Sequence, residues 1–241
     1  MSTIVEVKEK MRSLLAKAPF SNELKETKQR LDVVDFAFSN LNLDGSRITR
    51  AGVNSILDEN VIYDIPVKEH RLIGIHKALL SKMDDWNDMK KDVDISIAED
   101  VYKAIAETDT VEYRKGNPVL YHLDFVPADY LDIRDEFAKK LKQVDWKDYG
   151  GDFCAKAATF HMEVIRIYPF NDYTEMLARS IMQYIFISNG LFPISLKIDE
   201  VKYNNVISEA LLTGSYEEFA EIIRQSIILK LDYLIEKATP E

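Results

Sequence analysis

Apolar residues recur with a helical period of about 3.6 residues along most of the chain. Residues 3–17 place Ile4, Val7, Met11, Leu14 and Leu15 on one stripe of a helix. The same pattern predicts further helices over residues 21–38, 49–57, 65–83, 95–108, 129–144, 151–167, 174–189, 199–213 and 216–237. The sequence therefore predicts a mostly α-helical fold.

Polar residues indicate where several of these helices begin and end. Ser21 and Thr49 stand at helix starts, where a hydroxyl accepts a hydrogen bond from a free backbone N–H group. Asp44 and Gly45 predict a turn before the second of these starts. The polar run at residues 84–94 is expected to be a solvated connection between helices.

The period changes between residues 111 and 127, where apolar residues alternate along the chain. Alternation is typical of a half-buried strand, and a Gly-Asn-Pro turn at 116–118 separates two such segments. The pattern predicts a two-stranded β-hairpin at 113–127. No later segment resembles a third strand, so we expect an exposed edge that pairs with an extended segment of a protein partner. The candidate edge residues are Val119, Leu120, Tyr121 and His122.

Composition narrows the class of protein. The 241 residues include 41 acidic and 31 basic side chains, and this net charge of −10 opposes broad nucleic-acid binding, which needs clustered Lys and Arg. The single cysteine, Cys154, excludes an intramolecular disulfide and a multi-thiolate metal site. No stretch reaches the roughly 18 apolar residues of a membrane span, and the first residues lack the apolar core of a signal peptide. We expect a cytoplasmic protein with no nucleic-acid or membrane partner, and delivery into another cell stays open.

The most informative stretch is the helix–loop–helix segment at 153–189. Its centre, YPFNDYTEMLAR (168–179), begins seven residues after His161. This centre resembles the signature of Fic (Fido) domains, H-P-F-x-[DE]-G-N-G-R-x-x-R, which joins two helices. The resemblance implies a Fic-like helical domain and, in intact members, transfer of AMP from ATP to a protein hydroxyl. The matching residues are Pro169, Phe170, Asp172 and Arg179.

Five of the nine core positions of the signature, 168–176, differ in this chain. Tyr168 stands where the family has its catalytic histidine, the general base that takes a proton from the target hydroxyl. A tyrosine titrates near pH 10 and is a poor base at neutral pH, roughly three units lower. The family's glycine, asparagine, glycine and arginine are replaced by Tyr173, Thr174, Glu175 and Met176.

These replacements oppose binding of a nucleoside triphosphate. In the family the loop wraps the phosphates, the arginine neutralises them, and the acid helps hold magnesium. The resemblance therefore assigns a catalytic role and a magnesium contact to Asp172, and nucleotide contacts to Thr174, Met176 and Arg179. Glu175 adds negative charge where phosphate should approach the helix N-terminus. Mg²⁺ and ATP are therefore cofactors only if the altered site still binds nucleotide.

Flanking segments extend the resemblance to roughly residues 36–226. The segment LDGSRIT (43–49) resembles the family's inhibitory segment, with Asp44 and Gly45 at its acid and glycine positions. Asp is one methylene shorter than the family's Glu, which argues against contact with Arg179. The predicted hairpin resembles the flap that clamps the target. We divide the chain into an N-terminal helical extension (1–35), a Fic-like domain (36–226) and a C-terminal helix end and tail (227–241).

The same loop also has a purely structural interpretation. Asp172 followed by Glu175 fits a helix-capping pattern, and Glu175 and Arg179 have the spacing of a surface ion pair. In this interpretation Pro169 and Phe170 end one helix and plug the core.

Other candidate chemistry has less support. His161 lies on an apolar helix and is expected to be a hydrogen-bonded core residue. His70 and His76 are six residues apart, so they do not share a helix face as paired metal ligands would. Phosphate-binding glycine loops, a zinc-type HExxH and a G-x-S-x-G serine motif are absent from the sequence.

Three functions are compatible with the sequence. The first is a Fic-like protein with a degenerate loop that lacks ordinary AMP-transferase activity and binds a protein partner through the flap edge. The second is a transferase that moves AMP or another phosphate- or sugar-linked group to a protein hydroxyl by altered chemistry. The third is a structural or regulatory subunit that pairs with an intact Fic homologue. Assembly as a homo-oligomer also stays open.

Overall fold

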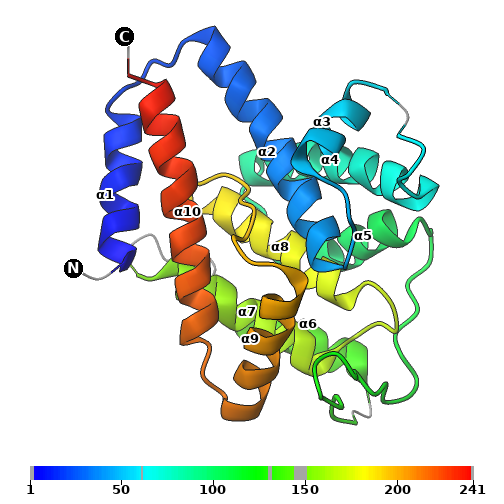
Figure 1. The fold of residues 1–241 in the computed structure, drawn as a ribbon. Helices are drawn as coiled ribbons and strands as arrows, with labels where there is room; N and C mark the ends of the chain where they lie inside the picture. Colours follow the sequence, from blue (N-terminus) through cyan, green and yellow to red (C-terminus); the bar gives the residue numbers. More distant parts are fainter. Residues whose placement is uncertain (1–2, 61, 130–131, 144–150, 240–241) are drawn as a thin grey trace.

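The computed structural model describes residues 3–60, 62–129, 132–143 and 151–239, and these form ten helices and no regular strand (Figure 1). The mostly α-helical fold is confirmed. The helices are α1 (Thr3–Leu15), α2 (Asn22–Leu43), α3 (Arg50–Leu57), α4 (Val67–Asp88), α5 (Ile95–Ala106), α6 (Ile133–Gln143), α7 (Phe153–Ile167), α8 (Thr174–Ser188), α9 (Glu200–Thr213) and α10 (Glu217–Lys237).

Helix α8 is the centre of the fold (Figure 1, yellow). Apart from Glu175, all its residues are buried. It packs against α7 and α5, and against α2 and α4. Its buried residues lie on all sides of the helix, so neighbouring helices must cover every face, which explains this central position. The α7–α8 loop is therefore attached to the most constrained part of the molecule.

Two of the expected helix caps are confirmed. The Ser21 hydroxyl accepts a hydrogen bond from the Leu24 N–H at 3.1 Å, and the Thr49 hydroxyl accepts one from the Gly52 N–H at 3.0 Å. The expectation for residues 84–94 is wrong in its first half, because α4 continues to Asp88. Trp86 in this run is 2% exposed and packs edge to face against another core ring, so burial extends the helix.

The predicted two-stranded hairpin at 113–127 is not formed. In the described residues, β-pairing is limited to one antiparallel bridge between Leu120 and Phe125, closed by N–H···O bonds of 2.9 and 3.3 Å. Leu120 and Leu123 are the buried leucines of this turn, three positions apart rather than two. Core contacts therefore select a compact turn at 120–125 instead of strands.

Upstream of this turn, Arg114 holds the chain in an irregular path. Its guanidinium is buried and donates to the backbone carbonyls of Gly116 and Ala128, each at 2.7 Å, and of Tyr168 at 2.8 Å. These bonds join both ends of the loop to the end of α7.

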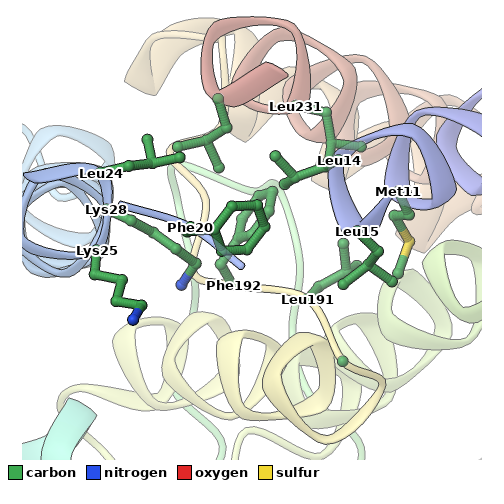
Figure 2. Close-up of a pocket in the computed structure, with 12 residues that line it drawn as sticks. Met11, Leu14, Leu15, Phe20, Leu24, Lys25, Lys28, Leu191, Phe192 and Leu231 are labelled. Atoms are coloured by element: carbon green, nitrogen blue, oxygen red, sulfur yellow. The ribbon is translucent and has the colours of Figure 1, made fainter. Parts of the chain in front are cut away.

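Helices α1 and α10 lie side by side and run in the same direction (Figure 1). Near their C-terminal ends, Lys17 Nζ donates to Thr239 Oγ1 at 2.8 Å. An apolar pocket of about 110 Å³ lies between α1, α2, α10 and the segment after α8, with Phe20, Leu14, Leu24 and Phe192 in its walls (Figure 2). It is at the C-terminal end of α8, whereas the candidate site is at the N-terminal end.

The three-part division of the chain stays a prediction. Its boundaries fall inside α2 and α10, and both helices continue across them. In the described part of the chain, no helix combines the length and the apolarity needed to cross a membrane.

Candidate functional site at the α7–α8 loop

The loop between α7 and α8 is closed by its own residues. Tyr168 ends α7 with a left-handed backbone (φ 47°) immediately before Pro169. Phe170 is fully buried, and its ring stacks on Tyr102 with centroids 3.9 Å apart. The Thr174 hydroxyl donates to the Phe170 carbonyl at 2.9 Å and accepts from the Phe170 N–H at 3.1 Å. The expectation that Pro169 and Phe170 end a helix and plug the core is confirmed.

The start of α8 differs from the predicted capping pattern. Its N-cap residue is Tyr173, which has a left-handed backbone (φ 61°) and makes no side-chain capping bond. The capping role predicted for Asp172 and Glu175 is therefore wrong, and Asp172 is exposed. The ammonium of Lys68 lies 4.7 Å from the centre of the Tyr173 ring and makes a cation–π contact with it. Tyr173 stands at a position where the family signature has glycine.

Glu175 connects the end of α7 to the turn at 120–125. Its Oε1 lies 2.7 Å from Nε2 of His122 and accepts a weak hydrogen bond from the Tyr168 hydroxyl at 3.5 Å. The predicted ion pair between Glu175 and Arg179 is wrong, because in the described residues Arg179 pairs with Asp44 instead.

These contacts determine the charge states around Glu175. Its hydrogen bond raises the pKa of the His122 imidazole above the ordinary value and favours the imidazolium. Burial, and then the charge of Glu175, raises the pKa of Tyr168. At neutral pH Tyr168 is therefore a protonated phenol and a hydrogen-bond donor, the opposite of what a general base requires.

Arg179 is fully buried and is held from three sides. Its Nε donates to Asn40 Oδ1 at 3.1 Å, and its Nη1 donates to the Tyr203 hydroxyl at 3.3 Å. Its Nη2 pairs with the Asp44 carboxylate. The expectation that Asp44 is too short to reach Arg179 is wrong, because the C-terminal end of α2 lies directly against α8. Because α2 and α8 are in contact, the shorter side chain of Asp44 reaches Arg179 without the additional methylene of a glutamate.

Two histidines, His76 and His161, have structural positions in the core. Tyr203 Oη lies 2.9 Å from His161 Nε2, and burial lowers the pKa of His161 to about 3, so the predicted core role of His161 is confirmed. His76 Nδ1 lies 2.6 Å from the Leu72 carbonyl oxygen, and burial lowers its pKa to about 4. Among the described residues, no group of three or more His, Cys, Asp and Glu side chains could hold a metal ion.

A pocket of about 290 Å³ opens at this loop. Of the predicted site residues, it brings together Asp44, His122, Tyr168 and Met176. The others are not among its lining: Gly45, Val119, Leu120, Tyr121, Asp172, Thr174 and Arg179. Three carboxylates face it, against one histidine. The lining residues are Leu43, Asp44, His122, Tyr168, Tyr173, Glu175, Met176, Glu200 and Asn204.

Two lining residues, Glu200 and Asn204, were missed by the sequence reasoning. Both belong to α9, and neither lies within the signature segment at 168–179. The signal lies in Gly45, whose φ is 82° and where a Cβ would come within 3.0 Å of the Glu200 carboxylate. A glycine that follows an acid in a turn is common in sequences, so Gly45 alone does not predict that Glu200 lies close to it.

Comparison with known proteins identifies the family. A family model described as Fic/DOC matches residues 66–186, which is half of the chain. This chain belongs to the Fic/DOC family. No curated protein matches the sequence.

Solved structures support the same fold for the whole chain. A Fic-domain-containing signaling protein from Bacteroides thetaiotaomicron is 17% identical, with a TM-score of 0.74 and full coverage of both chains. Fic-1 from C. elegans is 16% identical, with a TM-score of 0.73, covering 98% of this chain and 71% of that one. A Fic family protein from Desulfovibrio desulfuricans is 14% identical, with a TM-score of 0.72, covering 100% and 76%. At these identities the likeness establishes the Fic fold.

Proposed function

We propose that this Fic-family chain does not carry out ordinary AMP transfer and that it acts by binding a protein partner. The observation that carries the proposal is the position of Glu175 in the α7–α8 pocket, held by His122 and Tyr168. The phenol occupies the expected base position as a donor, so proton abstraction by that group is disfavoured.

The electrostatics of the pocket support the same proposal. Asp44, Glu175 and Glu200 all line it, and a carboxylate about 4 Å from a phosphate charge repels it by on the order of 1–4 kcal/mol. Met176 provides no positive charge, and Arg179 is already paired with Asp44. We infer that Mg²⁺ and ATP do not fit this set of side chains, and no step of the proposed function uses them.

The proposed partner surface is the turn at 120–125 with its neighbours. Val119, Tyr121 and Val126 are 51%, 87% and 53% exposed, which is unusual for large apolar side chains grouped on one short segment. The His122–Glu175 contact fixes this segment to α8. An ordered, exposed apolar loop suits recognition of a protein, and it requires no chemistry in the adjoining pocket.

The deciding experiment measures nucleotide binding and transfer by the full chain. Calorimetric titration with ATP, with and without magnesium, is expected to show no binding. Incubation of the protein with a cell lysate and ATP labelled on its α-phosphate is expected to label no protein band. Labelled bands that disappear in the Tyr168→Phe variant would instead establish a tyrosine-dependent transferase.

Repair variants test the role of the altered loop. Tyr168→His alone is expected to restore no transfer, because a general base contributes about 10²–10⁴-fold only when the phosphate is bound and placed. The fivefold variant is expected to be required, and both proteins are checked for folding by circular dichroism. Equal labelling by the single and fivefold variants would show that the present loop already binds nucleotide. The fivefold variant combines Tyr168→His, Tyr173→Gly, Thr174→Asn, Glu175→Gly and Met176→Arg.

A further inference from the structure

A second polar cavity lies between α2, α10, the start of α3 and the segment 193–197. Its volume is about 330 Å³, and its lining differs sharply in charge from that of the α7–α8 pocket. Three of its side chains are cationic and one is a carboxylate. The lining residues are Leu31, Asp35, Arg50, Ser195, Lys197, Ser226, Leu229, Lys230 and Tyr233.

The carboxylates at this cavity are already engaged by cations. Lys230 Nζ lies 2.7 Å from a carboxylate oxygen of Asp35 and 2.7 Å from one of Asp32. Asp35 also pairs with Arg50, and Asp32 with Lys28 at 2.6 Å. Three cations therefore already share two carboxylates, before Lys197 is considered.

Lys197 has a positive charge that no described residue pairs with, and Arg50, although paired with Asp35, keeps one donor nitrogen free. The ammonium of Lys197 makes no ion pair or hydrogen bond with a described residue, and Nη1 of Arg50 is buried without a hydrogen-bond partner. Partial desolvation of its ammonium, and then the charge of Arg50, lowers the pKa of Lys197. Among the residues that line the cavity, three cations accompany one carboxylate, an excess of two positive charges in a protein whose overall charge is −10.

The segment that carries Lys197 is fixed in place. Its backbone N–H donates to the Ser226 hydroxyl on α10 at 3.1 Å, and the Leu196 N–H donates to the Ser39 hydroxyl on α2 at 3.2 Å. Lys230 Nζ donates to the Pro193 carbonyl at 2.6 Å. The cations are therefore held near one another by a rigid frame, which is the condition for a preorganised anion site.

We propose that this cavity binds the phosphate group of a small organic phosphomonoester. Near neutral pH such a group carries close to two negative charges, which matches the excess of two cations, and its oxygens accept hydrogen bonds from ammonium, guanidinium and hydroxyl groups. The hydroxyl of Ser195 lines the cavity, while Leu31, Leu229 and Tyr233 provide apolar surface for an organic group.

This proposal is independent of the one for the α7–α8 pocket. There, three carboxylates line the cavity and repel phosphate, whereas here an excess of cations over carboxylates attracts it. The two cavities are lined by different acids: Asp35 within α2, and Asp44 nine residues later, at the C-cap of α2. An anion that binds one cavity is therefore not expected to compete for the other.

Phenyl phosphate is the probe that tests the assignment. Calorimetric titration of the full chain is expected to show one site for phenyl phosphate, weaker binding of inorganic phosphate, and no binding of phenol. Sodium chloride at matched ionic strength serves as the control for screening. Binding of phenol as tightly as phenyl phosphate, or no binding of either phosphate, would overturn the proposal.

Two variants locate the site. Lys197→Gln removes an exposed cation and is expected to weaken phenyl phosphate binding about tenfold, a typical loss for one charge-assisted hydrogen bond. Lys115→Gln makes the same charge change on an exposed lysine outside the cavity and is expected to bind as the parent does. Ser195→Asp places a carboxylate among the cations and is expected to abolish binding. If Lys197→Gln and Ser195→Asp, both folded by circular dichroism, bind like the parent, the cavity is not the site.

Discussion

Replacement of Asp44 by alanine removes the only carboxylate that pairs with Arg179 in the described part of the chain. The Arg179 side chain is 2% exposed, whereas that of Asp44 is 35% exposed. The substitution therefore leaves a buried guanidinium that keeps its hydrogen bonds to Asn40 and Tyr203 and loses its counter-charge. We expect a clear loss of stability without loss of the fold.

The size of this loss follows from the exposure of the two partners. Breaking a fully buried ion pair costs about 3–5 kcal/mol, whereas exposed pairs contribute about 0–1 kcal/mol. Because Asp44 is one-third exposed, water reaches the position that its carboxylate leaves, and we expect about 2 kcal/mol. For a chain of this length that corresponds to a fall in Tm of about 4–8 °C.

Urea unfolding followed by far-UV circular dichroism at neutral pH measures this loss. The matched control is Asp58→Ala, which removes the exposed ion pair between Asp58 and Arg30, whose N···O distance is 2.8 Å. The control is expected to change the free energy of unfolding by less than about 0.5 kcal/mol. Equal effects of Asp44→Ala and Asp58→Ala would refute the argument that Arg179 depends on its counter-charge.

Three further predictions concern single side chains. Glu175 raises the pKa of His122 in the folded protein. The pairing therefore contributes its full stability below about pH 6.5, the pKa of histidine in the unfolded chain, and this contribution is lost as the pH rises through the pKa of the folded state. Glu175→Gln should therefore destabilise more at about pH 6 than at about pH 9 in urea unfolding, and equal losses would contradict this. Burial lowers the pKa of His76 to about 4 in the folded protein. As the pH falls, His76 is therefore protonated in the unfolded chain before it is protonated in the folded one, which favours unfolding. Acidification from about pH 7 to 5 should cost about 2 kcal/mol at this residue, and His76→Leu should remove that dependence in unfolding titrations. Phe170→Ala should lower the free energy of unfolding by about 3–5 kcal/mol, and a calorimetric Tm equal to that of the parent would show that the ring does not plug the core.

The helices could be predicted from the sequence because their signals are local. Periodicity predicted α8 at 174–189, and it spans Thr174–Ser188. Ser21 and Thr49 cap the helices that follow them, since a hydroxyl needs only the N–H groups of the next turn. The order of the signature residues also sufficed to indicate the family, which the match over 66–186 establishes.

The contacts of the candidate site could not be predicted, because they join distant parts of the chain. Asp44 and Arg179 are 135 residues apart, and only the packing of α2 against α8 brings them together. Glu175 was assigned to a cap or a helical ion pair, the local options, whereas its partner His122 lies 53 residues away. The hairpin failed for the same reason: alternation predicted strands, but core contacts of Leu120 and Leu123 determined the turn.

The pairing of α1 with α10 has a consequence for synthesis of the chain. Val7 and Leu14 of α1 are buried, and the helix that packs against α1 is α10, about 200 residues later. At roughly 5–20 residues per second, a ribosome takes about 10–40 s to produce that partner. During this interval α1 exposes an apolar stripe that the finished protein hides. A chaperone that binds short amphipathic segments would therefore find α1 uncovered on the nascent chain until α10 has been synthesised.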